Sequence, residues 1–281
     1  MKTIRVGGLQ LGAADNQMDN NVQKILGYIE KAEKLGIHIL CMPELSITNY
    51  FPKDWYSDLN QYVLSDKDPI LRQIIASTED LKITVIFPYG EKTGAGIFNS
   101  AILINQGQVL GKYRKIHLPV LKEDSQFNNF EERYFAPGDL GFPVFQVDGV
   151  KIGIQICFDR HFPEGFRVLA VKGARIIFLP SNSASFGPDS YRLEMWERIN
   201  QVRAYENEVY LVAINKAGRE NGWEFLGNSM IVAPDGRIIK RLNHEEEGIF
   251  YTGIPLADLG KPGKYLGKRS PGDYKEIAAN G

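Results

Sequence analysis

The feature that most constrains the fold is an apolar segment, an amphipathic segment and a second apolar segment at the start of the chain. Residues 3–11 are mostly apolar, and a helical pattern follows, with apolar residues at spacings of mostly three and four: Val22, Ile25, Leu26, Ile29 and Ala32. The pattern stops at Gly36, and residues 38–44 are typical of a buried strand that ends near Pro43. A strand, a helix and a second strand in this order favour a parallel pair with a right-handed crossover. The sequence therefore predicts an α/β fold.

The same alternation of strands and helices continues along the chain. We expect helices at about 68–78, 164–172 and 191–207, and strands at 83–88, 99–105, 108–115, 144–147, 151–157, 174–180, 209–214, 228–232, 237–240 and 249–254. Gln106-Gly107 and Asp148-Gly149 are typical of hairpin turns. Residues 1–281 should therefore form one domain on two sheets with helices outside. The segment from about 256 to 281 is rich in Gly, Lys and Pro and is expected to form a docking arm.

The charge and the cysteine content exclude several classes of protein. The chain has 33 basic and 34 acidic side chains, so it lacks the basic surplus that nucleic acids or anionic membranes attract. The first residues lack the apolar core of a signal peptide, and no run of 18 apolar residues occurs. Two cysteines are too few for a secreted disulfide scaffold. These features predict a cytoplasmic protein whose partner is a small molecule, without nucleic-acid or membrane binding.

Cys157 is the most informative single residue. It ends the predicted strand 151–157 and precedes a predicted helix, and the amino-terminal end of a helix stabilises a thiolate. Ligands bind at the carboxyl ends of strands in open α/β sheets. A free cysteine is also commonly a small buried hydrophobe. Position alone therefore leaves both a nucleophile and a packing residue open.

Glu44 and Lys115 occupy comparable places, because each closes a predicted strand. Either residue alone is typical of a solvated charge at a strand end. A thiol nucleophile, however, needs a base for its proton and a cation or amide for the oxyanion that it creates. Together with Cys157, these two residues supply those parts without any histidine.

Three motifs resemble a known family. Pro43-Glu44, the segment GKYRKIHLP at 111–119 and the segment GIQICFD at 153–159 resemble the signature regions of the nitrilase (carbon–nitrogen hydrolase) superfamily. The resemblance implies a four-layer α-β-β-α sandwich, an obligate Glu-Lys-Cys triad, and a homodimer or homotetramer. It assigns Glu44 as the base, Lys115 as the oxyanion cation and Cys157 as the nucleophile.

Further residues follow from this resemblance. Many members use a second glutamate ahead of an aromatic pair, and Glu131 in FEERYF at 130–135 matches it best. The segments 131–145 and 112–119 are most similar to N-carbamoyl-D-amino acid amidohydrolases. Those enzymes tend to carry two adjacent arginines where this chain has Arg160-His161, whereas β-ureidopropionases tend to carry Arg-His. Both groups hold a substrate carboxylate with the arginine, so the resemblance implies that role for Arg160.

The remaining candidate site residues are two asparagines, two histidines and one phenylalanine. Asn182 falls where the D-carbamoylases have an asparagine, and Asn129 where they tend to have a histidine. His117 is expected to pack beside the Lys115 loop and is a candidate substrate contact, as is His161. The backbone amide of Phe158 is expected to share the oxyanion with Lys115.

The function predicted from these residues is hydrolysis of N-carbamoyl amino acids to the amino acid, carbon dioxide and ammonia. Cys157 would form a thioester, which water oriented by Glu44 and Glu131 resolves. The chemistry calls for neither a metal nor an organic cofactor, and the four histidines form no metal-spaced set with the cysteines. Two alternatives remain open: the same triad acting on an aliphatic amide, an ω-amide or N-carbamoylputrescine, and a catalytically silent binding protein with the same fold.

Overall fold

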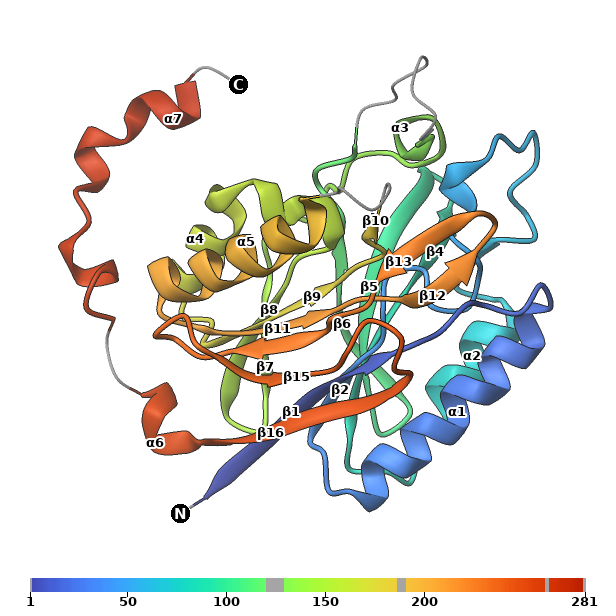
Figure 1. Ribbon diagram of the computed structural model, residues 1–281, viewed down its shortest axis with the longest axis horizontal. Coiled ribbons are helices and arrows are strands. Elements are labelled where there is room, and N and C mark those ends of the chain that lie inside the picture. Colours follow the sequence, from blue (N-terminus) through green and yellow to red (C-terminus); the bar gives the residue numbers. More distant parts are fainter. Residues whose placement is uncertain (1, 120–128, 186–190, 261–262, 280–281) are drawn as a thin grey trace.

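The computed structural model describes residues 2–119, 129–185, 191–260 and 263–279, and within them two large sheets pack face to face (Figure 1). The first sheet has the order β16-β1-β2-β4-β5-β6, with β3 beside β4. Its strands are β1 Thr3–Gln10, β2 Ile39–Cys41, β3 Val63–Leu64, β4 Thr84–Thr93, β5 Gly96–Asn105, β6 Gln108–Arg114 and β16 Gly248–Pro255.

The second sheet has the order β15-β14-β11-β9-β8-β7. Its strands are β7 Val144–Val147, β8 Val150–Ile154, β9 Ile176–Pro180, β11 Tyr210–Ile214, β14 Met230–Val232 and β15 Ile238–Arg241. A small third sheet has the order β10-β13-β12 and consists of β10 Ala184–Ser185, β12 Ala217–Glu220 and β13 Trp223–Leu226.

Helices cover the outer face of each large sheet. The helices α1 Met18–Lys34 and α2 Pro69–Ala76 lie on the first sheet, and α4 Pro163–Val171 and α5 Arg192–Asn207 on the second (Figure 1). The shorter elements are α3 Glu131–Tyr134, α6 Leu256–Leu259, α7 Lys275–Ala279 and the 3₁₀ turns η1 Phe51–Lys53, η2 Cys157–His161, η3 Leu266–Lys268 and η4 Pro271–Asp273. None of the helices in the described ranges is long and apolar enough to cross a bilayer.

The alternation of side chains along the strands explains the four layers. In β9, Ile176 and Phe178 pack into the core between the two sheets, whereas Ile177 and Leu179 pack under α4 and α5. Successive side chains of a strand point to opposite faces, so a continuously apolar strand is buried on both. The predicted α-β-β-α sandwich is therefore confirmed. The parallel β1–β2 pair and the two hairpins, with turns at Gln106-Gly107 and Asp148-Gly149, are also confirmed.

The small sheet was not expected from the sequence. Its strands are short, and β12 and β13 carry the exposed charges of Arg219 and Glu224, which pair across the hairpin. Such strands lack the apolar runs that mark the two large sheets. The turn Asn221-Gly222, with both residues at positive φ, was the available signal.

The segment after β16 runs outside the sandwich (Figure 1). The Glu208 carboxylate, at the end of α5, accepts hydrogen bonds from the backbone amides of Lys264 and Tyr265 at 2.5 and 2.8 Å. The Tyr205 and Tyr265 hydroxyls lie 2.6 Å apart. These contacts fall within the segment 256–281 that was expected to form an arm, of which residues 261–262 and 280–281 lie outside the described part of the chain.

Candidate active site

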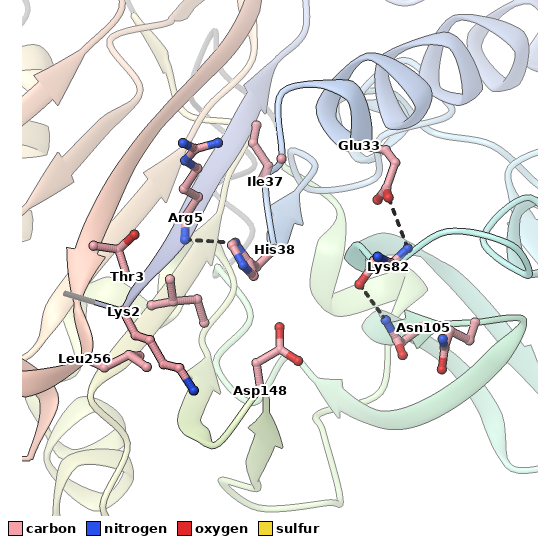
Figure 2. A pocket seen from close by; sticks show the side chains of 13 residues that line it. Lys2, Thr3, Arg5, Glu33, Ile37, His38, Lys82, Asn105, Asp148 and Leu256 are labelled. Carbon is pink, nitrogen blue, oxygen red and sulfur yellow. Dashed lines mark hydrogen bonds between the residues drawn. The ribbon is translucent and has the colours of Figure 1, made fainter.

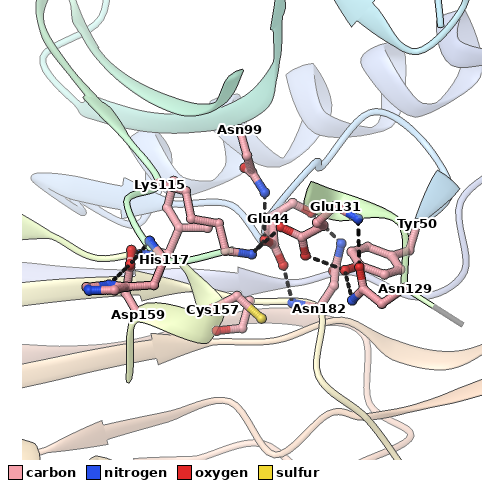
Figure 3. A network of polar contacts seen from close by, with 12 residues as sticks. Glu44, Tyr50, Asn99, Lys115, His117, Asn129, Glu131, Cys157, Asp159 and Asn182 are labelled. Carbon is pink, nitrogen blue, oxygen red and sulfur yellow. Dashed lines mark hydrogen bonds and ion pairs between the residues drawn. The ribbon is translucent and has the colours of Figure 1, made fainter. Parts of the chain in front are cut away.

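Three strand ends bring Glu44, Lys115 and Cys157 together (Figure 3). Glu44 follows β2, Lys115 directly follows β6, and Cys157 opens η2 after β8. Glu44 and Lys115 are 0% exposed and Cys157 is 9% exposed. A carboxylate, an ammonium and a thiol thus share a site from which bulk water is excluded.

Hydrogen bonds from both sheets fix the Glu44 carboxylate. Its Oε1 accepts from Asn99 Nδ2 and from Lys115 Nζ, each at 2.8 Å. Its Oε2 accepts from the backbone amide of Asn182 at 3.0 Å, and the Asn182 side chain donates to the Glu44 carbonyl at 2.7 Å. Asn182 follows β9 in the second sheet, so the carboxylate is held across the interface between the sheets. Asn182 therefore lies beside the site, where its hydrogen-bond partner is Glu44.

Lys115 also pairs with Glu131, whose Oε2 lies 2.6 Å from Nζ. Burial alone would lower the pKa of Lys115, but the Glu131 and Glu44 carboxylates raise it above its usual value. Lys115 therefore remains a cation. Burial and the Glu44 charge raise the pKa of Glu131, while Lys115 opposes the shift.

Tyr50, which the sequence analysis did not identify, orients Glu131. Its hydroxyl donates to Glu131 Oε1 and accepts from Asn129 Nδ2 at 3.0 Å (Figure 3). Asn129 Oδ1 accepts from the Glu131 backbone amide at 2.9 Å. Burial and the neighbouring Glu131 raise the pKa of Tyr50 well above its usual value, so this hydroxyl keeps the proton that it donates.

Cys157 adopts an uncommon backbone conformation, with φ +45°. The Asp159 carboxylate stabilises the turn: its Oδ2 accepts from the Ile156 amide at 2.9 Å and from the Tyr113 hydroxyl at 2.7 Å. Its Oδ1 accepts from the His117 amide at 3.0 Å and lies 2.8 Å from His117 Nδ1. Asp159 thus links two segments, the turn that carries the thiol and the loop that follows Lys115.

The thiol is protonated at rest. Burial and the nearby Glu44 raise the pKa of Cys157, against the opposing charges of Lys115 and Arg160. A raised pKa means that the thiol needs a base before it can attack a carbonyl carbon. Among the carboxylates, Glu44 acts most strongly on the thiol, and it lies beside Lys115 in the same buried cluster.

Arg160 lies beside the thiol. Its Nη1 donates to the Cys157 carbonyl at 2.9 Å and lies 3.6 Å from Sγ. The residue is 6% exposed, and its Nε has no hydrogen-bond partner among the described residues. A buried guanidinium with an unused donor is suited to an anionic acceptor.

His117, His161 and Phe158 lie around this cluster. The His117 ring stacks on Phe162 with the ring centroids 3.8 Å apart, and its Nδ1 is engaged by Asp159. Partial desolvation, together with Arg160 and neighbouring arginines, lowers the pKa of His161 to about 4. His161 is therefore neutral at pH 7. Phe158 is the second residue of η2, and its ring packs edge-on against Phe162 at 5.7 Å.

Of the predicted site residues, the structure gathers Glu44, Lys115, Glu131, Cys157, Arg160 and Asn182 into one buried cluster, with Phe158, His117 and His161 around it. Sequence reasoning missed Asn99, Tyr50 and Asp159. Asp159 lies inside a recognised motif, where a carboxylate beside a strand-to-helix turn was a usable signal. Tyr50 and Asn99 reach the site only through the tertiary fold.

A separate cavity of about 880 Å³ lies at the amino-terminal ends of β1, β2 and β4 (Figure 2). It includes Arg5, Lys82 and His38, and it contains none of the predicted site residues. His38 is only partly buried, and its Nδ1 accepts a hydrogen bond from the Arg5 amide at 3.1 Å. The described residues contain no group of three or more His, Cys, Asp or Glu that could hold a metal ion.

Comparisons with known proteins agree with the motifs. The family model described as carbon-nitrogen hydrolase matches residues 5–262. A nitrilase from Pyrococcus abyssi is 32% identical over 90% of both chains, and a citrullinase from Francisella tularensis is 31% identical over 99% of both. An N-carbamoylputrescine amidase from Oryza sativa is 30% identical over 91% of this chain and 87% of its own.

Solved structures give the same result. The crystal structure of an amidase from Nesterenkonia sp. matches with a TM-score of 0.80 and 25% identity, covering 98% of this chain and 96% of that chain. A variant of that amidase carries the acetamide moiety of fluoroacetamide on its active-site cysteine. The chain therefore belongs to the carbon–nitrogen hydrolase family of the nitrilase superfamily, and it is a cysteine-dependent hydrolase of carbon–nitrogen bonds in small amides.

Proposed function

We propose that this hydrolase cleaves the carbamoyl C–N bond of N-carbamoyl amino acids, with Glu44, Lys115 and Cys157 as its catalytic residues. The observation that carries the proposal is the buried Arg160 guanidinium, which lies 3.6 Å from Sγ of Cys157 with its Nε unpartnered in the described structure. An arginine fork recognises a carboxylate through two parallel hydrogen bonds. A substrate carboxylate held there would place the adjacent ureido carbon near the thiol.

In the first step, Glu44 takes the Cys157 proton as the sulfur attacks the carbamoyl carbon. The carbonyl oxygen becomes an oxyanion between the Lys115 ammonium and the backbone amide of Phe158. Both donors are fixed before the substrate binds, so they stabilise the developing charge without reorganising. Because the pKa of Lys115 is raised, the cation persists throughout the working pH range.

In the second step, Glu44 returns the proton to the departing amine, and the free amino acid leaves. The carbamoyl group remains on Cys157 as a thioester. Water then attacks the thioester carbon, Glu44 accepts its proton with Glu131 assisting its orientation, and the thiol is regenerated. The released carbamate decays to carbon dioxide and ammonia.

The charges near Cys157 support an anionic substrate. Arg160 and Arg192 each lie close enough to Cys157 to interact with it electrostatically, and burial together with Arg160 lowers the pKa of Arg192. Two of the named relatives, the citrullinase and the N-carbamoylputrescine amidase, are named for ureido substrates, which supports a carbamoyl group as the reacting part.

The test is ammonia release from a panel of D- and L-carbamoyl amino acids, carbamoyl-β-alanine, carbamoylputrescine, an ω-amide and butyramide. We expect kcat/KM to be highest for substrates that carry both a carbamoyl group and a nearby carboxylate. A preference for butyramide or for carbamoylputrescine, which lack a carboxylate, would contradict the proposal and favour a neutral-amide hydrolase.

Assembly and location are part of the same proposal. We propose a homodimer or homotetramer of single-domain subunits, each with a C-terminal arm at about 256–281. Exposed apolar side chains on α4 and α5, including Val171, Val202 and Tyr205, support an interface there. The unpaired thiols Cys41 and Cys157 are consistent with the predicted cytoplasmic location. Light scattering of the wild type and of Val202→Glu tests the interface, which predicts a smaller particle for the variant.

A further inference from the structure

A second buried Lys–Glu pair lies behind the site. Lys216 follows β11, Glu220 ends β12, and the Nζ to Oε2 distance is 2.9 Å. Lys216 is 0% exposed and Glu220 is 7% exposed. The Lys216 ammonium also donates to the Thr48 carbonyl at 3.1 Å and lies 5.4 Å from the centre of the Phe225 ring. None of the catalytic steps above uses this pair.

Glu220 also binds the backbone of two other segments. Its Oε1 accepts from the Tyr50 amide at 2.5 Å, and its Oε2 accepts from the Ala14 amide at 2.8 Å. The pair therefore binds the backbone at Thr48 and at Tyr50, in the segment between Glu44 and η1. The same small sheet packs on the Tyr50 side chain, because Trp223 stacks on its ring at 5.6 Å.

Tyr50 connects this pair to the reacting groups. Its hydroxyl donates to Oε1 of Glu131, and Oε2 of Glu131 accepts from Lys115 at 2.6 Å. A displacement of the Tyr50 backbone would move the hydroxyl, and the Glu131 carboxylate would turn with it. The Lys115 ammonium would then lose part of the contact that sets its direction.

We infer that Glu220 is a positioning residue for the reaction. With Lys216 it fixes the Tyr50 backbone, so that the Tyr50 hydroxyl holds Glu131 against Lys115. This inference rests on the roles proposed above for Lys115 and Glu131. Burying an ion pair is costly and is often no better for stability than an apolar pair of similar volume. An apolar pair would fill the same space, but it would leave the Tyr50 amide without its acceptor. A positioning role therefore predicts that the apolar pair keeps the fold but slows turnover.

The sharpest variant is Lys216→Met/Glu220→Leu, which removes both charges and keeps side-chain volume. We expect the double variant to fold with a lower melting temperature, because the Tyr50 and Ala14 amides lose their acceptor, and its kcat to fall about 10- to 100-fold, since a displacement of about 1 Å costs on this scale. KM should change less than kcat. A folded double variant with kcat within twofold of the wild type would overturn the positioning role.

The matched control is Glu224→Ala on the same hairpin. Glu224 pairs with Arg219 at 2.9 Å, but this pair is exposed and contacts no site residue in the described structure. We expect kcat to be unchanged within twofold. A loss as large as that of the double variant would mean that any disturbance of the hairpin slows turnover, which contradicts a specific role for Glu220.

A cycle with Tyr50→Phe tests whether the effect passes through the tyrosine. If Glu220 acts by placing the hydroxyl, the Lys216→Met/Glu220→Leu change should cost less than threefold in kcat once the hydroxyl is gone. Equal fold losses in the wild-type and Tyr50→Phe backgrounds would show that the pair acts elsewhere and would overturn the inference.

The assay uses whichever amide of the panel gives the fastest turnover, so the identity of the natural substrate does not affect it. Glu131→Gln, measured alongside, distinguishes a failure of the role proposed for Glu131 from a failure of the positioning role of Glu220. Unchanged turnover in Glu131→Gln would refute the role proposed for Glu131. A slow Glu131→Gln together with a fast Lys216→Met/Glu220→Leu would refute only the positioning role of Glu220.

Discussion

The Nζ atom of Lys115 lies 2.8 Å from Oε1 of Glu44, and both side chains are completely buried. Because Oε2 of Glu131 lies 2.6 Å from the same Nζ, one cation is shared by two carboxylates. The thiol beside them has a raised pKa, so it remains protonated until a base takes the proton. The proposed mechanism moves one proton between Cys157 and Glu44 while Lys115 stays charged.

Lys115→Arg should behave as a disruptive change. The guanidinium is broader than an ammonium and spreads its charge, and the two carboxylates leave Lys115 fully enclosed. Losing one oxyanion contact typically costs about 10²–10³ in turnover, and we expect a loss of that size in kcat. Lys112→Arg, on the strand β6 that leads to Lys115 but partly exposed, is the control and should keep its activity. Normal turnover in Lys115→Arg would make Lys115 a structural charge.

Asp159→Asn should loosen the turn that presents the thiol. The amide has one acceptor oxygen where the carboxylate has two, so the contacts to Ile156 and His117 cannot both persist. We expect about 1.5–3 kcal/mol less stability in urea unfolding, together with slower turnover. Asp148→Asn, at an exposed hairpin turn with φ +49°, is the control and should be neutral. Wild-type stability in Asp159→Asn would contradict this role.

Glu91→Gln should change the pH dependence of stability. Burial would raise the pKa of Glu91, but hydrogen bonds from Arg114 and Lys112 lower it below its usual value. A carboxyl with a lowered pKa contributes stability above the unfolded pKa of about 4.3, and that contribution is lost as the pH falls. At pH 7 the free energy of unfolding of the variant should be about 1.5–3 kcal/mol lower than that of the wild type. This difference should shrink below about pH 4. Equal differences at both pH values would refute the account.

Arg160→Ala should be selective between substrates. A charge-assisted pair with a carboxylate is worth roughly 1.5–3 kcal/mol, so kcat/KM for carbamoyl amino acids should fall about 10- to 150-fold more than for a neutral amide. A common loss is expected for both, because Arg160 also holds the Cys157 carbonyl. The comparison should be made at about pH 8, because Arg160→Ala removes one of the charges that lower the pKa of His161, and an unperturbed imidazole is mostly neutral there. Equal losses would exclude carboxylate binding by Arg160.

The sequence predicted the two large sheets because their strands are long apolar runs such as residues 176–179. Patterns of this kind are local and can be recognised without the tertiary structure. It did not predict the small sheet. Strands β12 and β13 are stabilised by Trp223 and Phe225 packing on Tyr50, a contact between segments far apart in the chain. The turn Asn221-Gly222 was the one local sign of that hairpin.

The site was predicted unevenly for the same reason. Glu44, Lys115 and Cys157 stand at strand ends within motifs, whereas Glu131 was found only through the family resemblance. Tyr50 and Asn99 reach the carboxylates from a loop and from the middle of a strand, so no local pattern marks them. Glu220 is more remote still, since it acts on Tyr50 through a backbone amide.

In the proposed mechanism, Cys157 carries the acyl group. The direct measurement is mass spectrometry of protein quenched in acid during turnover, followed by peptide mapping. We expect an acyl adduct on the Cys157 peptide of the wild type and none in Cys157→Ala, which should fold but not turn over. Cys41, which is buried and donates to the Met42 carbonyl, is the control, and Cys41→Ala should stay active. An adduct on Cys41, or turnover by Cys157→Ala, would contradict the account.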